Sequence, residues 1–165
     1  VIDQRATSQF IISDFNKDKE SFGSNEVSLL SCHFEDDTNL PINQFNSGDE
    51  IGLVIKVLCK TPIHCLNFAF LLKDKQGTII FSESTAHYEL NLITVENQVV
   101  ETKFKFRMPR LLRGNYTLDL AVSDGTTYEH RQVLWQYDAF QVTVLEDKLV
   151  QGIFAPNDFR IFVST

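Results

Sequence analysis

The chain lacks the sequence patterns that mark most catalytic and membrane-spanning proteins. Its 165 residues contain no uninterrupted apolar run of about 18 residues, the length that a membrane-spanning helix needs. Neither a Gly-rich phosphate loop nor a Gly-x-Ser-x-Gly nucleophile motif is present. The four histidines lie in separate segments, so no spacing marks a nucleophile with its base. We therefore expect a domain that is not an enzyme.

Basic residues are also scarce. The chain has 15 Lys and Arg against 22 Asp and Glu, which gives a formal net charge of −7. A protein that neutralises phosphates needs a basic patch, so nucleic acid is not an expected partner. Basic side chains cluster only at Lys103, Lys105, Arg107, Arg110 and Arg113. Alternation turns the first three outward, where a solvated strand face is the ordinary interpretation.

Metal-ligand spacings are missing as well. The set Cys59, His64 and Cys65 does not match the close ligand pairs of zinc modules. Glu35–Asp37 lacks the spaced oxygen ligands and the glycine of a calcium-binding loop. We expect neither a metal nor another cofactor.

Cysteine is rare, and three cysteines cannot all form disulfides with one another. Cys32 and Cys59 lie within apolar, strand-like runs. Buried free thiols in a reducing compartment are the simplest interpretation, which favours the cytoplasm.

No segment shows the 3.6-residue periodicity of a capped amphipathic helix, whereas strand signals recur. These runs cover residues 27–34, 50–60, 66–73, 78–82, 99–108, 115–122 and 139–145. Turn residues separate the runs, and Gly and Asn supply the positive φ that such turns need. The 14 phenylalanines suit the space between two packed sheets. The sequence predicts an all-β protein with an immunoglobulin-like antiparallel β-sandwich fold.

The stretch 99–125 carries the clearest alternation of apolar and polar residues. We interpret it as two strands of one half-buried antiparallel sheet, joined by a short loop around 109–114. This interpretation exposes a polar row of Glu101, Lys103, Lys105, Arg107, Thr117, Asp119 and Ser123.

Three parts of the chain are expected: an irregular lead or linker over residues 1–21, the sandwich over 22–145, and a C-terminal arm over 146–165. The first residue is Val1 rather than a methionine, which suggests a piece of a longer protein. Within the arm, the apolar segment 152–163 predicts a further strand. That strand either covers an edge of its own sheet or joins a neighbour's sheet, and we favour an arm swapped between two copies.

Aromatic and hydrogen-bonding residues near strand ends suggest carbohydrate binding, because sugars offer apolar C–H faces and rings of hydroxyls. Trp135 with Tyr137 and Arg131 has the right residue types, although a core tryptophan between the sheets is an equally open interpretation. The full set of candidates is Trp135, Tyr137, Arg131, Tyr88, His87, Asp119, Thr117 and Lys105.

Several short motifs, in this order, resemble one known family. They are FGSNEV at 22–27, FNSGDEI at 45–51, FLLKDKQG at 70–77 with IFSEST at 80–85, LRGNY at 112–116 and DAFQV at 138–142. Together they are similar to the C-terminal domain of Wzt-type ATP-binding subunits of O-antigen polysaccharide exporters, over residues 22–145.

The resemblance implies a β-sandwich that binds carbohydrate and is attached to the ATPase of an ABC transporter. It implies recognition of the modified end of a finished O-polysaccharide, a dimer, and contact through the parent protein with the transporter's membrane permease. The implied location is the cytoplasmic face of the bacterial inner membrane. Glycan contacts vary within the family, so no site residue is carried over.

A second functional hypothesis is a structural β-sandwich that mediates dimerisation or protein interaction without binding glycan. In that case the apolar segment 152–163 is the functional part.

Overall fold

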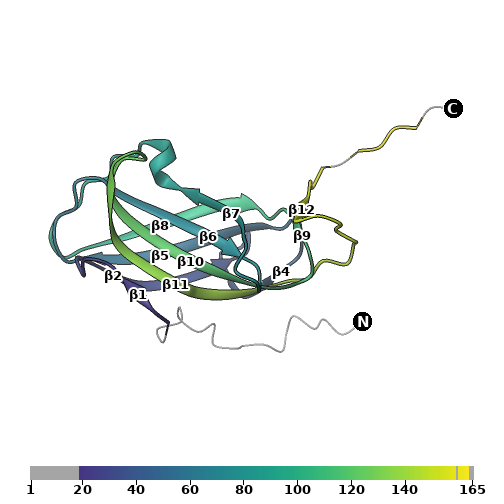
Figure 1. Ribbon diagram of the computed structural model, residues 1–165, viewed down its shortest axis with the longest axis horizontal. Coiled ribbons are helices and arrows are strands. Elements are labelled where there is room, and N and C mark those ends of the chain that lie inside the picture. Colours follow the sequence, from purple (N-terminus) through teal and green to yellow (C-terminus); the bar gives the residue numbers. More distant parts are fainter. Residues whose placement is uncertain (1–18, 159, 164–165) are drawn as a thin grey trace.

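Alternating apolar and polar residues form strands because each strand can bury one face and leave the other in water. The computed structural model describes residues 19–158 and 160–163, which form two β-sheets packed face to face (Figure 1). The larger sheet has the order β1 (Ser21–Phe22), β11 (His130–Val144), β10 (Gly114–Gly125), β6 (Leu66–Lys73) and β7 (Ile79–Ser84). The smaller sheet has the order β3 (Pro41–Ile42), β2 (Val27–Glu35), β5 (Glu50–Cys59) and β8 (Gln98–Arg107).

Short elements complete the sandwich. β4 (Gln44–Phe45) runs parallel to the end of β11, whereas the strands named above pair antiparallel. A turn of 3₁₀-helix, η2 (Thr85–Tyr88), follows β7 directly. β9 (Arg110–Leu111) pairs with β12 (Phe154–Ala155) in a separate two-stranded ladder. The predicted all-β antiparallel sandwich is confirmed.

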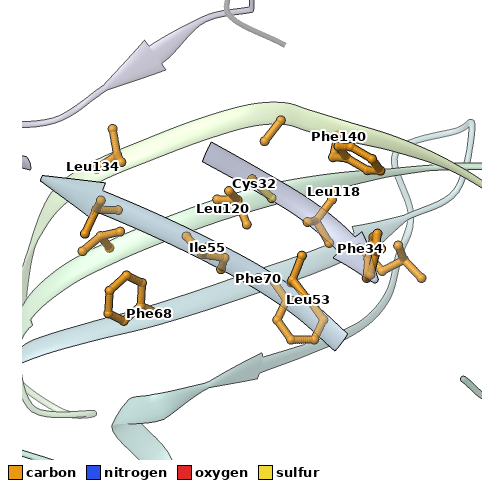
Figure 2. Close-up of a cluster of buried hydrophobic side chains, with 14 of the residues drawn as sticks. Cys32, Phe34, Leu53, Ile55, Phe68, Phe70, Leu118, Leu120, Leu134 and Phe140 are labelled. Carbon is orange, nitrogen blue, oxygen red and sulfur yellow. The ribbon is translucent and has the colours of Figure 1, made fainter. Parts of the chain in front are cut away.

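The core lies between the two sheets, where Figure 2 shows side chains from both layers interleaving. Phe34 packs edge-on against Phe45 and Phe140, with ring centroids 6.0 and 5.8 Å apart. Cys32 is buried in the same layer, and Cys32, Cys59 and Cys65 are all free thiols. Burial raises the pKa of the Cys32 thiol above its ordinary range, so this thiol stays protonated.

The two strands predicted within 99–125 exist, but their predicted pairing is wrong. β8 is hydrogen-bonded to β5 in the smaller sheet, and β10 lies between β6 and β11 in the larger one. The connection that contains β9 therefore crosses from one sheet to the other. Alternation specifies which face of a strand is buried, but that apolar face can be buried equally well in either of the two sheets.

The last core strand is much longer than its predicted range of 139–145, because β11 begins at His130. An irregularity interrupts its pairing with β10 near Asp138, which adopts a positive φ of 43°. This bulge shifts the alternation within β11, so the sequence pattern indicated only the part of the strand that follows the bulge.

The C-terminal arm contains a strand of two residues, β12, in place of the longer strand predicted over 152–163. β12 pairs with β9 of the same chain, and Asn157 donates a hydrogen bond to the carbonyl of Met108 at 3.0 Å. Beyond this attachment the chain runs away from the sandwich (Figure 1). Ile161, Phe162 and Val163 are 75%, 90% and 84% exposed.

At the other end, most of the predicted lead 1–21 lies outside the described residues. Its last residue, Ser21, already belongs to β1, which pairs with β11 through Phe22 opposite Trp135. In the part of the chain that the structure describes, no helix is long and apolar enough to cross a membrane.

Candidate functional site

β7 is an edge strand of the larger sheet and β8 is an edge strand of the smaller sheet, on the same side of the sandwich. A cleft of about 520 Å³ lies between these two strands. Its volume is within the range of known small-ligand sites. Side chains on the inner faces of β7 and β8 form its floor, and outward side chains of β8 with the η2 turn form its rim. No further strand of the described residues closes the sandwich at this edge, which leaves the cleft open.

Four phenylalanines make the floor aromatic. The rings of Phe70 and Phe106 are stacked at 5.7 Å, and Phe104 packs edge-on against Phe70 at 5.1 Å. Phe81 of β7 packs edge-on against Phe70 and Phe106, at 5.9 and 5.8 Å. Phe70 is 1% exposed, whereas the other three are partly open to the cleft.

Glu83 fixes the rim on the β7 side. Its carboxylate accepts hydrogen bonds from the backbone N–H of Ser84 at 2.8 Å and the hydroxyl of Tyr88 at 3.3 Å, and lies 2.9 Å from Nδ1 of His87. These hydrogen bonds, that of Ser84 above all, lower the pKa of Glu83, so it is ionised at neutral pH. The ionised carboxylate holds the η2 turn so that Tyr88, which is 63% exposed, stands at the mouth of the cleft.

Buried hydrogen bonds attach the same turn to the larger sheet. The hydroxyl of Thr85 accepts a hydrogen bond from the N–H of Phe68 at 2.9 Å and donates to Asn67 Oδ1 at 3.2 Å. Thr127 donates a further hydrogen bond to the carbonyl of Ala86 at 3.1 Å. The rim residue Tyr88 is therefore placed by a turn that is anchored at several points.

The opposite rim is the row Lys103, Lys105 and Arg107 on β8. Lys103 forms an ion pair with the buried Glu35 and donates to Asn39 Oδ1 at 2.7 Å. Arg107 pairs with Glu50 at 3.1 Å. Lys105 forms no ion pair or hydrogen bond with any residue that the structure describes.

A second, more polar hollow of about 300 Å³ lies across β8 from the cleft. Lys105, Phe106 and Arg107 border both depressions. The carboxylates of the second hollow come from Asp36, Asp37 and Glu50.

The structure places Tyr88 and Lys105 at the cleft, with His87 beside it, but separates the other predicted residues from it. Trp135 and Tyr137 lie on the outer face of the larger sheet. There the Trp135 ring stacks on Phe22, with centroids 6.0 Å and planes 14° apart, and Tyr137 lies 5.9 Å away. The alternative of a core tryptophan between the sheets is wrong, because the register pairs Trp135 with Phe22 and Ala121 on the outer face.

Arg131 lies at one end of the sandwich and is bound to acidic residues of the same chain. Both its terminal nitrogens contact Glu26, and it donates to Asp124 at 2.9 Å. Its hydrogen bonds, with help from Ser24, lower the pKa of Glu26 to about 2. A guanidinium held in this way is an internal cross-link between β10, β11 and the start of β2.

The expectation that Asp119 is exposed is wrong, because only 3% of the residue is accessible. Its carboxylate pairs with Lys73 at 2.7 Å and accepts a hydrogen bond from the N–H of Asp138 at 2.8 Å. Lys73 also binds Asp138 at 3.0 Å, and its bonds to the two carboxylates raise its pKa although burial opposes this. The charged cluster stabilises the β11 bulge, and Thr117 is half-buried beside it.

Sequence reasoning missed the cleft itself. Phe104 and Phe106 alternate with the basic residues of β8, a pattern that indicates only a buried strand face, and Phe81 and Glu83 were noticed only as part of the motif at 80–85. Their roles depend on the pairing of β7 with β6, which places Glu83 opposite Phe70. Among the described residues, no three His, Cys, Asp or Glu side chains are grouped so that they could hold a metal ion.

Comparison with known proteins gives one family and one close fold. The family model described as the Wzt C-terminal domain matches residues 18–156. The crystal structure of the C-terminal domain of Wzt superposes with a TM-score of 0.80 at 16% identity, covering 92% of both chains.

A Niemann-Pick type C2 protein from Japanese carpenter ant has a TM-score of 0.50 at 10% identity, covering 77% of this chain and 98% of that one. At these identities the structures show a shared fold and nothing finer. No curated protein matches the sequence.

Proposed function

The chain belongs to the Wzt C-terminal domain family, and from this premise we propose that it is the carbohydrate-binding part of an O-antigen ABC transporter. In this proposal it recognises the modified end of an O-polysaccharide and couples that recognition to export. The single observation that carries the proposal is the cleft between β7 and β8, with its aromatic floor and polar rim.

Sugar binding matches the chemistry of this cleft. Phe81, Phe104 and Phe106 offer ring faces and edges to the C–H groups of a pyranose, and burying this apolar surface is favourable. Tyr88 and Ser82 on the rim supply hydroxyl partners for sugar hydroxyls. Binding of this kind needs no cofactor, and modest affinity is expected because sugar hydroxyls exchange water partners for protein ones.

In the proposed role the domain performs no chemistry of its own. Glu83 is the carboxylate among the side chains that line the cleft, and it is held by the N–H of Ser84 and the side chains of His87 and Tyr88. A general acid needs a proton to donate, whereas the lowered pKa of Glu83 keeps it ionised.

We further propose that the parent protein places this domain at the cytoplasmic face of the inner membrane, next to the permease, and that two copies associate through the arm. The exposed apolar residues Ile161, Phe162 and Val163 support the last point, because a second copy would remove them from water. In the described chain the arm is attached to its own β9 through β12 and to Met108 through Asn157, so we propose that the contact between copies involves residues beyond Asn157.

The test compares two exposed tyrosines on different surfaces. The ¹⁵N-labelled chain is titrated with the O-polysaccharide of the bacterium that encodes it, and Tyr88→Ala is compared with Tyr137→Ala. We expect resonance shifts centred on β7 and β8, with affinity lowered about tenfold by Tyr88→Ala and unchanged by Tyr137→Ala. Absence of any shift at millimolar oligosaccharide would refute glycan binding, and the reverse pattern would move the site to the Trp135 surface.

The exposed apolar end also favours a second function, a sandwich that only mediates dimerisation. Deleting residues 158–165 keeps β12 and distinguishes the two functions. A truncated monomer that still binds polysaccharide would show that binding and assembly are separate. A chain that never binds polysaccharide but loses dimerisation on truncation would establish the structural function instead.

A further inference from the structure

We propose that the cleft between β7 and β8 takes an anionic sugar, whose carboxylate or phosphate group is bound by Lys105. This inference rests on the proposed function and specifies its substrate class. It is carried by a cation that has no partner within the described part of the chain and lies beside an aromatic floor, in a protein whose net charge is −7.

Among the residues that the structure describes, the pattern of ion pairs on β8 leaves one cation without a partner. Alternate outward positions carry Lys103, Lys105 and Arg107, and acidic residues of the same sheet neutralise the first and the last. Lys105 has no such partner among the residues that the structure describes. An ammonium with no internal carboxylate can bind a ligand's anion without first breaking an ion pair.

Gly52 explains why Lys105 is the one left over. The register places Glu35 opposite Gly52 and Gly52 opposite Lys105, so Glu35 and Lys105 lie in one cross-strand row. Lys103 reaches over Gly52 to Glu35 instead, and its Cε would lie 2.8 Å from a Cβ at position 52. Because the glycine has no side chain, Lys103 occupies that space and forms the ion pair with Glu35, which leaves Lys105 without it.

Charge around the two depressions favours the cleft side of Lys105 for an anion. The hollow across β8 has Asp36 and Asp37 in its lining besides the Glu50–Arg107 pair, and these two carboxylates repel another negative group there. The cleft has Glu83 as its lining carboxylate, and that group lies on the opposite rim and binds its own turn. A ring seated on the phenylalanine floor can therefore direct an anionic substituent toward Lys105.

The experiment measures binding of three sugars that differ in charge: methyl glucopyranoside, methyl glucuronide and glucose 6-phosphate. Inorganic phosphate serves as a fourth probe. Each is titrated into the ¹⁵N-labelled chain at low ionic strength, and the Kd is taken from shifts on β7 and β8. Lys105→Gln removes the charge, and Lys75→Gln is the matched control, since Lys75 is exposed in the turn between β6 and β7.

We expect at least one of the two charged sugars, methyl glucuronide and glucose 6-phosphate, to bind about tenfold more tightly than methyl glucopyranoside. The reason is that a hydrogen bond to a charged group contributes more than a hydrogen bond between neutral groups. Lys105→Gln should abolish this preference and Lys75→Gln should keep it. Salt should weaken the charged sugars selectively. The better of the two charged probes identifies the anion.

Two results would overturn the inference while leaving glycan binding intact. One is equal affinity for neutral and charged sugars, with no effect of Lys105→Gln. The other is inorganic phosphate binding as tightly as glucose 6-phosphate, which would mean that the aromatic floor makes no contact with the sugar ring. Failure of the proposed function itself looks different, because then neither these sugars nor the polysaccharide would shift any cleft resonance.

Discussion

Replacing Asp119 by Asn tests whether its buried carboxylate stabilises the fold or binds ligand. The substitution keeps a side-chain oxygen that can accept the hydrogen bond from the backbone N–H of Asp138, which is 2.8 Å from Asp119 Oδ1 in the native chain. It removes the negative charge that Lys73 Nζ contacts at 2.7 Å. The side chains of Lys73 and Asp119 are only 15% and 5% exposed, so solvent screens this pair poorly. The fold therefore loses an ion pair in a largely dry site.

The expected cost follows from the partners that remain. Removing one partner of a buried pair costs roughly 3–5 kcal/mol when the other charge is left alone. Lys73 keeps Asp138 at 3.0 Å, so we expect about 2 kcal/mol for Asp119→Asn. Asp119→Ala also deprives the Asp138 N–H of its acceptor, which adds roughly 1.5–3 kcal/mol. The alanine variant should therefore be clearly less stable than the asparagine variant.

Urea unfolding of the whole chain measures both losses as changes in the free energy of unfolding. Asp147→Asn is the control, because that side chain is 91% exposed and lies 3.8 Å from Arg113, where an ion pair contributes little. A loss below about 0.5 kcal/mol for Asp119→Asn, comparable with the control, would refute the buried-pair reasoning. If a folded Asp119→Asn variant bound sugar more weakly than the control, Asp119 would contribute to ligand binding after all.

Two further predictions concern stability. The Lys103 side chain lies against Gly52 where it reaches the buried Glu35, so Gly52→Ala should displace Lys103 and lower the free energy of unfolding by about 1–2 kcal/mol. The better strand propensity of alanine partly offsets this loss. Urea unfolding measures the change, and a stabilised variant would contradict the prediction. Because Arg131 lowers the pKa of Glu26 from 4.5 to about 2, the pair should stabilise the fold above pH 4.5 and lose this contribution as the pH falls toward 2. With this site open to solvent screening, Glu26→Gln should cost about 1 kcal/mol near neutral pH and almost nothing near pH 2, and a cost that does not change with pH would exclude the linkage.

The sequence predicted the strands better than their partners. The run 66–73 coincides with β6 because its alternation is bounded by turn residues on the following side. Alternation over 99–108 and 115–122 also located β8 and most of β10. It could not assign them to different sheets, because the period of two specifies the buried face and leaves the hydrogen-bonded neighbour open.

Asp119 shows why a polar residue in an alternating strand is not always exposed. Its alternation was correct, and it does face away from the core. Lys73 on the adjacent strand and the bulged Asp138 then cover it, and both contacts require the three-dimensional register. The candidate site has the same limit. Tyr88 and Lys105 were predicted individually, whereas the cleft that brings them together exists only once the edges β7 and β8 are placed.

The charges on β8 also have a second consequence, because β8 is an edge strand with unpaired backbone groups. Lysines on an edge strand hinder pairing with the edge of another molecule. This effect requires only charge, whereas binding of an anionic sugar requires positive charge. Lys105→Glu separates the two: it should leave the chain as monodisperse in sedimentation as the unsubstituted protein while reversing its preference for charged sugars. A Lys105→Glu chain that stays monodisperse with its sugar preference unchanged would show that position 105 acts only through the edge.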